Sequence, residues 1–597
     1  IQFLNSGLIS LVVFPAWWMA RRFVGPGLAF FAAVFAVSVP AMNYAGIIGT
    51  ESLAYPTCTA AFAAMLLALA RPGWRTAVTA LLAIALAAFT RMQMVLLIPI
   101  LATSLLLVAA MHGRDGWRGY LASQRTVLVS LGVGAILGAV FLMIAGQSSV
   151  GIYLKIFHSA PITIDNALYW LRGFVSDLYL VTGILPTVAT FALLGARQNR
   201  RHRWVGPLLA LALVASLFFT LQMTLFSAIN TEHWRERNIF YERYMFYLGP
   251  IFVAGFVASF GRVSSRAAIG STLVAVALVA GTPPDIIGLP FSIDAFGQAY
   301  IAFILSDHDS LLPVIGPLLA GLTVMLGALL VLSTLGGRYQ RLAAWGRGLA
   351  LGLTLFLLLI TQFKAWSFSQ IYSQGMRERQ PRPLNFVERA TKQRVAFLPT
   401  AESETSTLYA TTFWNPNVER IFVSEKAPIS SPPVFAPHCE LRWRSDGTIV
   451  PPRDARPACQ LTPAAWLTQS NLFSMHLRDE TLRKRAHGGI VSTVTASDRP
   501  VRIFSLLGGR NTRHGGVSDR LELRSFLDRP GELELVVEAG APDVSLRLPG
   551  GRSLELDHGR QETVRLPVAA RDHLTRVEVV STGAARGRPV DLKRVRL

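Results

Sequence analysis

The fold of this chain can be predicted from residues 71–114, which read RPGWRTAVTALLAIALAAFTRMQMVLLIPILATSLLLVAAMHGR. This stretch contains two apolar runs, residues 76–90 and 92–111, and Arg91 alone separates them. A membrane-spanning helix needs about 20 predominantly apolar residues, because the hydrocarbon core of a bilayer is about 30 Å thick. The stretch therefore predicts two membrane spans that are joined by a tight turn at Arg91.

Apolar runs of the same kind fill the chain up to Trp366, and charged residues crowd after it. The chain has 597 residues and is 16% charged, whereas soluble domains are about a quarter charged. Residues 1–366 thus predict a polytopic α-helical membrane domain of about twelve spans. The expected spans are 3–20, 24–44, 53–70, 76–90, 92–111, 126–146, 176–196, 204–226, 244–260, 267–281, 311–333 and 348–366.

The connections between these spans alternate in charge. Those after even-numbered spans contain few basic residues, although two of them are long. Cytoplasmic loops carry an excess of Lys and Arg. We therefore expect a multi-pass protein of the plasma (inner) membrane that begins outside and whose C-terminal part is extracytoplasmic. The basic residues after odd-numbered spans are Arg21, Arg22, Arg71, Arg75, Arg114, Arg118, Arg125, Arg197, Arg200, Arg201, Arg203, Arg262, Arg266, Arg338, Arg341 and Arg347.

The net charge of +21 would also suit a protein that binds nucleic acid. Arginines in membrane loops explain most of this charge more simply. We therefore expect membrane lipids, and no nucleic acid, among the partners.

The sequence beyond the last span predicts three segments. Residues 367–395 are charged and contain two prolines, so we expect a linker. Residues 396–490 predict a mixed α/β region that contains Cys439 and Cys459, which would form a disulfide in an extracytoplasmic compartment. The third cysteine, Cys58, lies in an apolar run and is expected to be a buried, inert thiol.

Residues 495–597 predict a β-sandwich-like domain. Seven short alternating runs, separated by turn residues, are typical of an antiparallel sandwich. This segment contains no Trp or Tyr, so a structural or docking role is at least as plausible as sugar binding. The preceding segment is the better candidate for contact with a glycan, because it contains the aromatic residues Tyr409, Phe413, Trp414, Trp443 and Trp466.

Ionisable residues at the ends of apolar spans are candidates for function, because charge is costly in a membrane. Arg91 could bind a phosphate through its guanidinium or extend to the lipid headgroups. Glu51 could line a pocket or simply occupy the first turn of a helix. No nucleotide-binding loop, hydrolase elbow or zinc motif is present, and we predict no metal site.

A second group of candidates lies in the expected outer loops. Glu242, Arg243 and Tyr244 open the ninth span, where an interfacial aromatic belt with a local ion pair would equally explain them. His158 and Asp165 in the long second outer loop are weaker pocket candidates.

Short motifs in a fixed order carry a resemblance to a known class of enzymes. The chain resembles the GT-C glycosyltransferases, integral-membrane enzymes that use polyprenyl-phosphate sugars. It is most similar to the bacterial relatives of protein mannosyltransferases, aminoarabinose transferases and arabinosyltransferases. The residues that carry the resemblance are Ala20-Arg21-Arg22, Val39-Pro40, Gly49-Thr50-Glu51-Ser52-Leu53, Phe89-Thr90-Arg91-Met92-Gln93 with Pro99, and Glu242-Arg243-Tyr244 before Pro250.

The resemblance implies a glycosyltransferase that moves a sugar from a polyprenyl-phosphate donor to an extracytoplasmic glycan, lipid or protein acceptor. Arg91 and Arg243 would bind the donor phosphate, and Glu51 would shape the pocket. A divalent cation assists some relatives, but no set of ligands for it is evident in this sequence.

The class places its catalytic carboxylate in the first outer loop, between the first two spans. This chain begins on the outer side, so we expect that loop to precede Ile1 and assign no catalytic base here. Two other functions fit the spans: a transporter or flippase of lipid-linked sugars, and a non-catalytic protein of envelope assembly.

Overall fold

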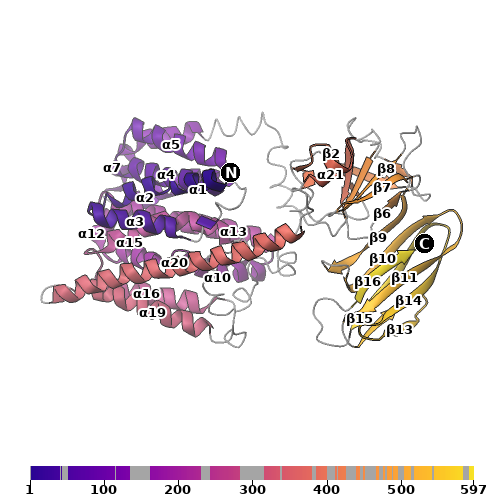
Figure 1. Cartoon of the computed structure of the whole chain (residues 1–597). Coiled ribbons are helices and arrows are strands. Elements are labelled where there is room, and N and C mark those ends of the chain that lie inside the picture. The colour runs from indigo at the N-terminus through magenta and orange to yellow at the C-terminus, as the bar shows by residue number, and fades with distance from the viewer. Residues whose placement is uncertain are drawn as a thin grey trace. The chain divides into compact units, whose positions relative to one another are not determined.

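The structure of the chain is a computed structural model, which divides into two compact units, Ile1–Ile371 and Tyr372–Leu597 (Figure 1). The structure describes residues 2–39, 42–43, 51–113, 116–134, 162–229, 242–282, 315–335, 339–379, 385–399, 411–412, 414–424, 438–443, 448–450, 465–469, 475–477, 480–486, 489–494, 503–512, 516–540, 543–581 and 590–596.

The first unit is helical. Its helices are α1 (Gln2–Ser10), α2 (Val13–Ala20), α3 (Pro26–Ser38), α4 (Glu51–Ala70), α5 (Trp74–Thr90), η2 (Met92–Leu96), α6 (Leu97–Met111), α7 (Trp117–Ser123), α10 (Ile164–Leu180), α11 (Leu185–Ala192), η3 (Leu193–Gly195), α12 (Arg197–Arg201), α13 (Val205–Ile229), η4 (Glu242–Leu248), α15 (Gly249–Ser259), α16 (Ser265–Ala280), α19 (Ile315–Ser333) and α20 (Gln340–Arg379).

The described helices include several that can cross a bilayer. By length and composition there are 6 of them, or up to 7 if the bent pair of α10 and α11 is one span. Expected spans such as 24–44, 76–90 and 267–281 coincide with shorter apolar helices of 10–17 residues, here α3, α5 and α16, and residues 135–146 of the sixth expected span lie outside the described residues. The predicted fold class, a helical membrane part followed by a sheet part, is confirmed.

The surface of the first unit is apolar, as a lipid-facing surface must be. Large apolar side chains are exposed all along its helices, for example Phe30, Leu82 and Leu217. Beyond Ile371, the exposed large apolar side chains of the described residues are Trp414 and Leu574 alone. An apolar surface of this extent would cause aggregation if it were exposed to water, so these helices lie in a membrane.

The seventh expected span differs from the sequence prediction. The helices α10 and α11 meet at 94° instead of forming one straight helix over residues 176–196. Gly183 and Ile184 have φ angles of 81° and 66°, which the chain reaches easily only at glycine. The N–H of Ile184 donates to the Tyr179 carbonyl at 2.6 Å, so the bend satisfies its own backbone.

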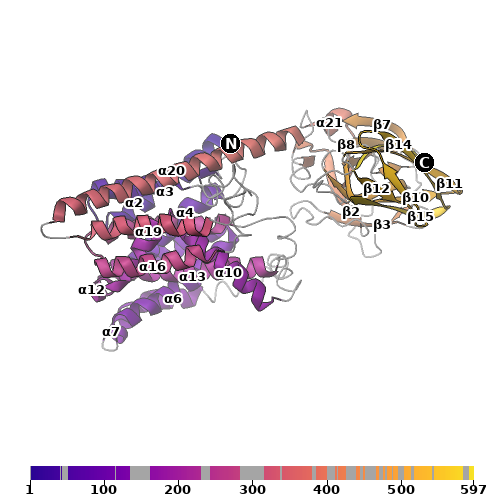
Figure 2. The same cartoon turned by 90° about the horizontal axis from the view of Figure 1, so that it is seen from below.

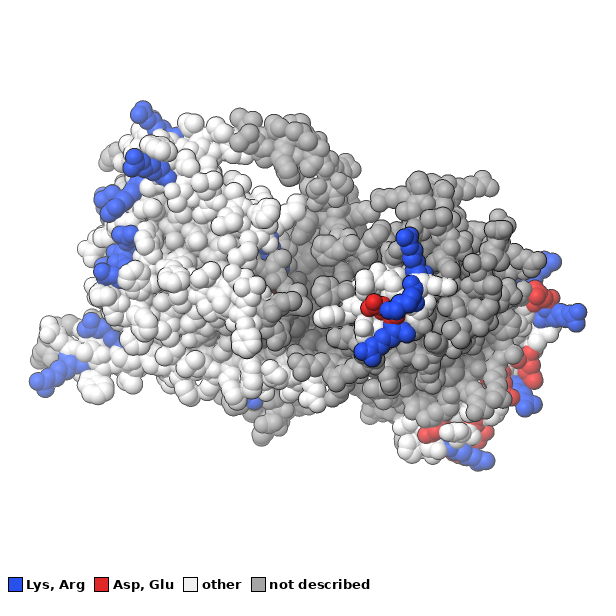
Figure 3. Space-filling model, turned by 45° about the horizontal axis from the view of Figure 1, so that its top comes forward, with Lys and Arg blue, Asp and Glu red and all other residues white. Residues whose placement is uncertain are grey.

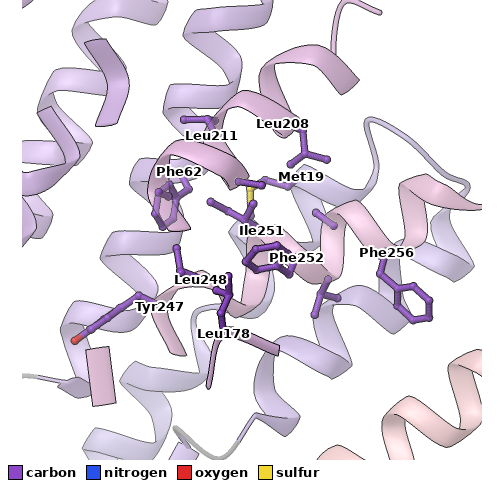
Figure 4. Packing of buried hydrophobic residues seen from close by; sticks show 14 of the residues in the cluster. Met19, Phe62, Leu178, Leu208, Leu211, Tyr247, Leu248, Ile251, Phe252 and Phe256 are labelled. Carbon is purple, nitrogen blue, oxygen red and sulfur yellow. The ribbon is translucent and has the colours of Figure 1, made fainter. Parts of the chain in front are cut away.

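The core of the first unit is formed by apolar side chains from α2, α4, α10, α13, η4 and α15 (Figure 4). Small residues let some helices approach closely, as is usual between membrane helices. A Cβ at Gly255 on α15 would overlap the Thr190 side chain of α11, and a Cβ at Gly327 on α19 would overlap Thr272 of α16. The helices α16 and α19 accordingly lie side by side (Figure 2).

The last helix of the unit is longer than its expected span. It begins at Gln340 and continues to Arg379, well into the segment that the sequence predicts to be a linker. Most residues after Trp366, including Gln374, Arg377 and Glu378, are adequate helix formers, so charge alone does not end the helix.

The second unit contains helix α21 and two sheets. The elements are α21 (Phe386–Ala390), β1 (Val395–Pro399), β2 (Val418–Ser424), β3 (His438–Trp443), β4 (Ile449–Val450), β5 (Ala465–Gln469), β6 (Met475–Leu477), β7 (Glu480–Ala486), β8 (Gly489–Val494), β9 (Ile503–Thr512), β10 (Gly516–Leu527), β11 (Gly531–Ala539), β12 (Val544–Arg547), β13 (Ser553–Leu556), β14 (Gln561–Val568), β15 (Arg571–Ser581) and β16 (Val590–Arg596).

The first sheet is mixed. Its 7 strands have the order β4-β3-β2-β1-β5-β8-β7. The pairs β1–β2, β1–β5 and β2–β3 are parallel, and the pairs with β4, β7 and β8 are antiparallel. Parallel neighbours need crossover connections, which is why this region does not show the regular hairpin spacing of the following one.

The second sheet is antiparallel and has 9 strands. The seven alternating runs of the sequence overlap seven of its strands, and β6 and β13 are additional strands. Alternate side chains of β11 and β14 are buried, and they join residues of β10, β12, β13, β15 and β16 in one apolar cluster. The two-layered sandwich itself stays a prediction.

Candidate functional site

The site centres on Arg91, which lies in the tight turn that the sequence predicts. Helix α5 ends at Thr90, η2 begins at Met92, and Arg91 between them is extended, with φ −154° and ψ 114°. Its N–H still donates to the Ala87 carbonyl at 3.0 Å. Because the chain leaves the helical path at this point, the Arg91 side chain turns into the helical unit instead of continuing along α5.

Glu51 is the partner of Arg91. It is the first residue of α4, and α4 packs along α5. The Nη1 atom of Arg91 donates to Glu51 Oε1 at 2.5 Å, and the two side chains are only 10% and 9% exposed. A buried ion pair is tolerated only where further hydrogen bonds compensate for lost hydration.

Gln93 and two tyrosines supply these further contacts. Arg91 Nε donates to Gln93 Oε1 at 2.6 Å, and Nη1 also donates to the Tyr247 hydroxyl at 3.2 Å. Gln93 Nε2 donates in turn to the Tyr244 hydroxyl at 2.9 Å. The Tyr244 ring lies 4.6 Å from Arg91 Cζ, which adds a cation–π contact. Five side chains from α4, the α5–η2 turn and η4 therefore form one network, which we call the Arg91 network.

The guanidinium keeps part of its binding capacity. Arg has five N–H donors, and the printed bonds of Arg91 involve Nε and Nη1. Within the described part of the chain, Nη2 has no hydrogen-bond acceptor. The network thus fixes the plane of the guanidinium through Nε and Nη1.

Aromatic packing holds the tyrosines in place. Tyr247 stacks on Phe246 at 4.3 Å between ring centroids and on Phe219 at 6.3 Å. Its ring lies at the margin of the apolar core, and its hydroxyl points away from the other labelled side chains (Figure 4). Tyr55 of α4 packs edge-on against Phe246 and donates to the Ala36 carbonyl at 2.9 Å. The packed aromatic rings therefore hold the Tyr247 hydroxyl in position.

The structure distinguishes between the alternative interpretations of Arg91 and Glu51. A snorkelling arginine would reach out to the headgroups, whereas Arg91 is buried and paired. Glu51 does occupy the first turn of α4, as the capping interpretation predicts, and it also binds Arg91. Glu242 and Tyr244 lie on η4, 2% and 4% exposed. Arg243 lies between them, and its side chain is outside the described atoms.

The other candidates do not join the Arg91 network. Asp165 is exposed in the first turn of α10, where Thr163 accepts a hydrogen bond from the Asn166 N–H, so it suits a helix start. His158 and Cys459 lie outside the described residues, and so does the side chain of Cys439 on β3. Cys58 is a fully buried thiol, as expected.

Asp177 is a buried acid that the sequence interpretation missed. It lies on α10 and is 1% exposed, and its carboxyl group lies beside that of a second buried acid. Its electrostatic neighbour is Glu242 on η4. The signal was present in the sequence, because an aspartate inside an apolar helix is a functional candidate. The seventh expected span, residues 176–196, begins just before it, so Asp177 falls at the edge of that span.

The described residues offer no evident metal site. They contain no group of three His, Cys, Asp or Glu side chains that could hold an ion. The carboxylate of Glu51 is engaged by Arg91. We therefore derive no chemical step that depends on a divalent cation.

Comparison with known proteins finds a similarity among solved structures. A scan against models of protein families finds no match, and a search of curated proteins finds none. Among solved structures, the chain is similar to the crystal structure of ArnT from Cupriavidus metallidurans in the apo state, with 15% identity and a TM-score of 0.40. The similarity covers 82% of this chain and 83% of that chain. The function has to be argued from the residues of the site.

Proposed function

We propose that this chain is a membrane glycosyltransferase of the GT-C type, which transfers a sugar from a polyprenyl-phosphate donor to an acceptor outside the cytoplasm. One observation carries the proposal. A buried guanidinium at the end of two membrane helices is oriented by Glu51, Gln93 and Tyr247. It retains Nη2 for an anion.

The chemistry of the donor needs such a group. When the glycosidic bond to the phosphate breaks, negative charge develops on the leaving phosphate oxygen. A preorganised cation that lies next to this oxygen stabilises the charge in the transition state, because it pays no reorganisation cost at that moment. Arg91 is the residue that we assign to this role, and Arg243 is a second candidate from the motif.

Glu51 acts in this scheme as a positioning residue. Its carboxylate is held by Arg91 at 2.5 Å, and a carboxylate engaged in this way is a poor general base. It instead fixes the guanidinium and balances its charge before the donor binds. Tyr244 and Gln93 restrict the other degrees of freedom.

The lipid tail of the donor has an apolar surface beside the site. On α5, Phe89 is 92% exposed and Leu86 is 54% exposed, and on η2 Val95 is 49% exposed. These side chains flank Arg91 in the sequence and face the surface of the helical unit. A polyprenyl chain lying on them would bring its phosphate to the level of the guanidinium.

The test uses the full-length protein in lipid nanodiscs with a radiolabelled polyprenyl-phosphate pentose or hexose. We expect sugar transfer by the natural sequence, its loss in Arg91→Ala, and partial retention in Arg91→Lys, which keeps the charge but not the fork of donors. Arg75→Ala is the matched control, because Arg75 is an exposed arginine in the first turn of α5 that stacks on its neighbour Trp74.

Three outcomes would contradict the proposal. Transfer at the full rate by Arg91→Ala would remove its central residue. Movement of intact donor across liposomes without transfer would instead identify a flippase. Glycan binding by the second unit without either activity would favour an assembly protein, and the exposed Trp414 would be the first residue to substitute there.

A further inference from the structure

Arginines gather at the end of the helical unit that lies away from the Arg91 network. Figure 3 shows the Lys and Arg side chains of this unit concentrated at one end. Helix α4 connects the two ends, because Glu51 is its first residue and Arg71 follows its last. A helix of 20 residues is about 30 Å long, so the two groups lie about one bilayer core apart.

Two of these arginines, Arg22 and Arg71, lie over the ring of Trp204, and Arg22 also lies over that of Trp18. The Arg22 guanidinium lies 4.1 Å from the Trp18 ring and 5.2 Å from the Trp204 ring, and Arg71 lies 5.5 Å from the Trp204 ring. The two rings are themselves edge to face at 6.3 Å. Trp18 lies in the last turn of α2, Arg22 and Arg71 follow α2 and α4, and Trp204 precedes α13, so three helix ends converge here. We call this group the Arg22–Arg71 cluster.

Neighbouring arginines have a structural task that these two lack. Arg203 Nε donates to the Ala70 carbonyl at 3.0 Å, and Arg262 donates to the carbonyls of Ala258 and Phe23 at 2.9 Å and 3.1 Å. They satisfy carbonyls at helix ends, where a positive charge is favourable. In the described part of the chain, neither Arg22 nor Arg71 has a side-chain hydrogen-bond acceptor, and Arg22 Nε is buried.

Among the described residues, the cluster also has no counter-charge. Among the connections that carry these arginines, the sequence contains a single carboxylate, Asp115, and no described acidic side chain forms an ion pair with Arg22 or Arg71. Burial, followed by the charges of Arg71 and Arg21, lowers the pKa of Arg22. Two guanidinium groups held over one indole ring repel each other, and an anion between them would relieve that repulsion.

We propose that Arg22 and Arg71, with Trp18 and Trp204, form a binding site for the phosphodiester headgroup of an anionic membrane lipid. Guanidinium groups bind phosphate oxygens bidentately, and basic pockets between helix ends hold lipid headgroups in this way. Tryptophans are enriched at the level of the headgroups. Beside the cluster, Phe14, Trp17 and Trp74 are 68%, 41% and 65% exposed, which gives acyl chains a surface to cover.

The proposal concerns the leaflet at the arginine end and does not depend on the transferase assignment. It predicts that a bound anionic lipid stabilises the junction of α2, α4 and α13. A free phosphate ion would use the same guanidinium groups but would gain nothing from the apolar surface, so a lipid is the occupant that the whole cluster fits.

The test measures binding of dioleoyl phosphatidylglycerol to delipidated full-length protein by native mass spectrometry, with dioleoyl phosphatidylcholine and inorganic phosphate as comparison ligands. The variant Arg22→Gln/Arg71→Gln should weaken phosphatidylglycerol binding about tenfold or more. The matched control is Arg75→Gln/Arg118→Gln, which removes the same charge from arginines that stack only on their neighbours Trp74 and Trp117. It should change binding by less than about twofold, since its arginines do not converge.

Trp204→Leu provides a second variant that keeps every charge. It should weaken binding too, because it removes the ring that both guanidinium groups share, and it remains informative if the double variant does not fold. Equal weakening in the two double variants would reduce the site to diffuse charge and overturn the proposal. Equal binding of phosphatidylcholine, or displacement of the lipid by inorganic phosphate, would also overturn it.

Discussion

Glu51 and Arg91 form a buried ion pair, with Oε1 and Nη1 2.5 Å apart, although 40 residues separate them in the sequence. The pair lies where α4 begins and α5 ends. It joins the start of one membrane helix to the end of the next, so it has a structural consequence as well as the proposed catalytic one.

Removing one partner of this pair should destabilise the helical unit. Glu51→Ala leaves the Arg91 charge buried and unpaired, and breaking a buried pair costs about 3–5 kcal/mol. We expect a clear fall in the thermal unfolding midpoint in detergent. Glu51→Gln should cost less, because its amide oxygen still accepts a hydrogen bond from Nη1.

A double-mutant cycle separates the pair from its surroundings. Glu51→Ala/Arg91→Ala should be destabilised by less than the sum of the two single variants, because the second substitution removes the charge that the first leaves unpaired. Strict additivity would mean that the two side chains do not interact in the membrane.

Tyr247→Phe tests the hydroxyl that supports Arg91. The ring and its stacking remain, but the 3.2 Å bond to Nη1 is lost. A hydrogen bond to a charged group contributes about 1.5–3 kcal/mol, so we expect roughly a tenfold or larger fall in kcat/KM for sugar transfer. The control is Tyr120→Phe, which loses a comparable bond to the Leu69 carbonyl at the arginine end. An equal loss of activity in both variants would point to general destabilisation.

The sequence predicts the parts of the site but not their meeting. Hydropathy places the turn at Arg91, and the start of a helix places Glu51, because both depend on local residues. Their contact depends on how α4 packs along α5, and the role of Tyr247 depends on where η4 returns after more than a hundred residues. Such long-range contacts leave no periodic signal in a single sequence.

Two local features were also beyond the hydropathy pattern. The run of apolar residues around Gly183 and Ile184 is continuous, so it predicts a straight span, and only the positive φ angles produce the bend. The apolar run that predicts the seventh span begins at residue 176, so the sequence places Asp177 at the edge of the expected helix. In the structure, the helix begins earlier, at Ile164, and this buries the carboxyl group.

Gly255→Ala tests the close approach of α11 and α15. The added methyl group would overlap the Thr190 side chain, and overpacking of this kind costs about 1–3 kcal/mol. Gly270→Ala on α16 is the control, because nothing lies within 4 Å of its Cβ position, and alanine favours helix over glycine. Its unfolding midpoint should stay equal or rise.

A compensating substitution makes this prediction specific. Thr190→Ala removes the atoms that the new methyl group meets, so Gly255→Ala/Thr190→Ala should recover part of the lost stability. Recovery will be incomplete, since the Thr190 hydroxyl also donates to the Phe252 carbonyl at 3.1 Å. If the double variant were less stable than Gly255→Ala alone, close packing would not be the cause.

His202 should make the start of α13 sensitive to pH. Its Nδ1 accepts hydrogen bonds from the N–H groups of Trp204 and Val205 at 3.2 Å and 3.3 Å, so the neutral ring caps the helix. Burial, followed by the charge of Arg262, lowers the pKa of His202 from its ordinary value of 6.5. The contribution to stability is therefore complete above pH 6.5 and is lost as the pH falls through the lowered pKa.

The measurement is the unfolding midpoint in detergent between pH 7.5 and pH 5, compared with His202→Asn. Asparagine also caps helices but does not titrate in this range, so the variant should lose less stability on acidification than the natural sequence. In a protonated ring, Nδ1–H would face the N–H groups of Trp204 and Val205, so protonation removes both hydrogen bonds and lowers stability. The same pH dependence in both proteins would assign it to other groups.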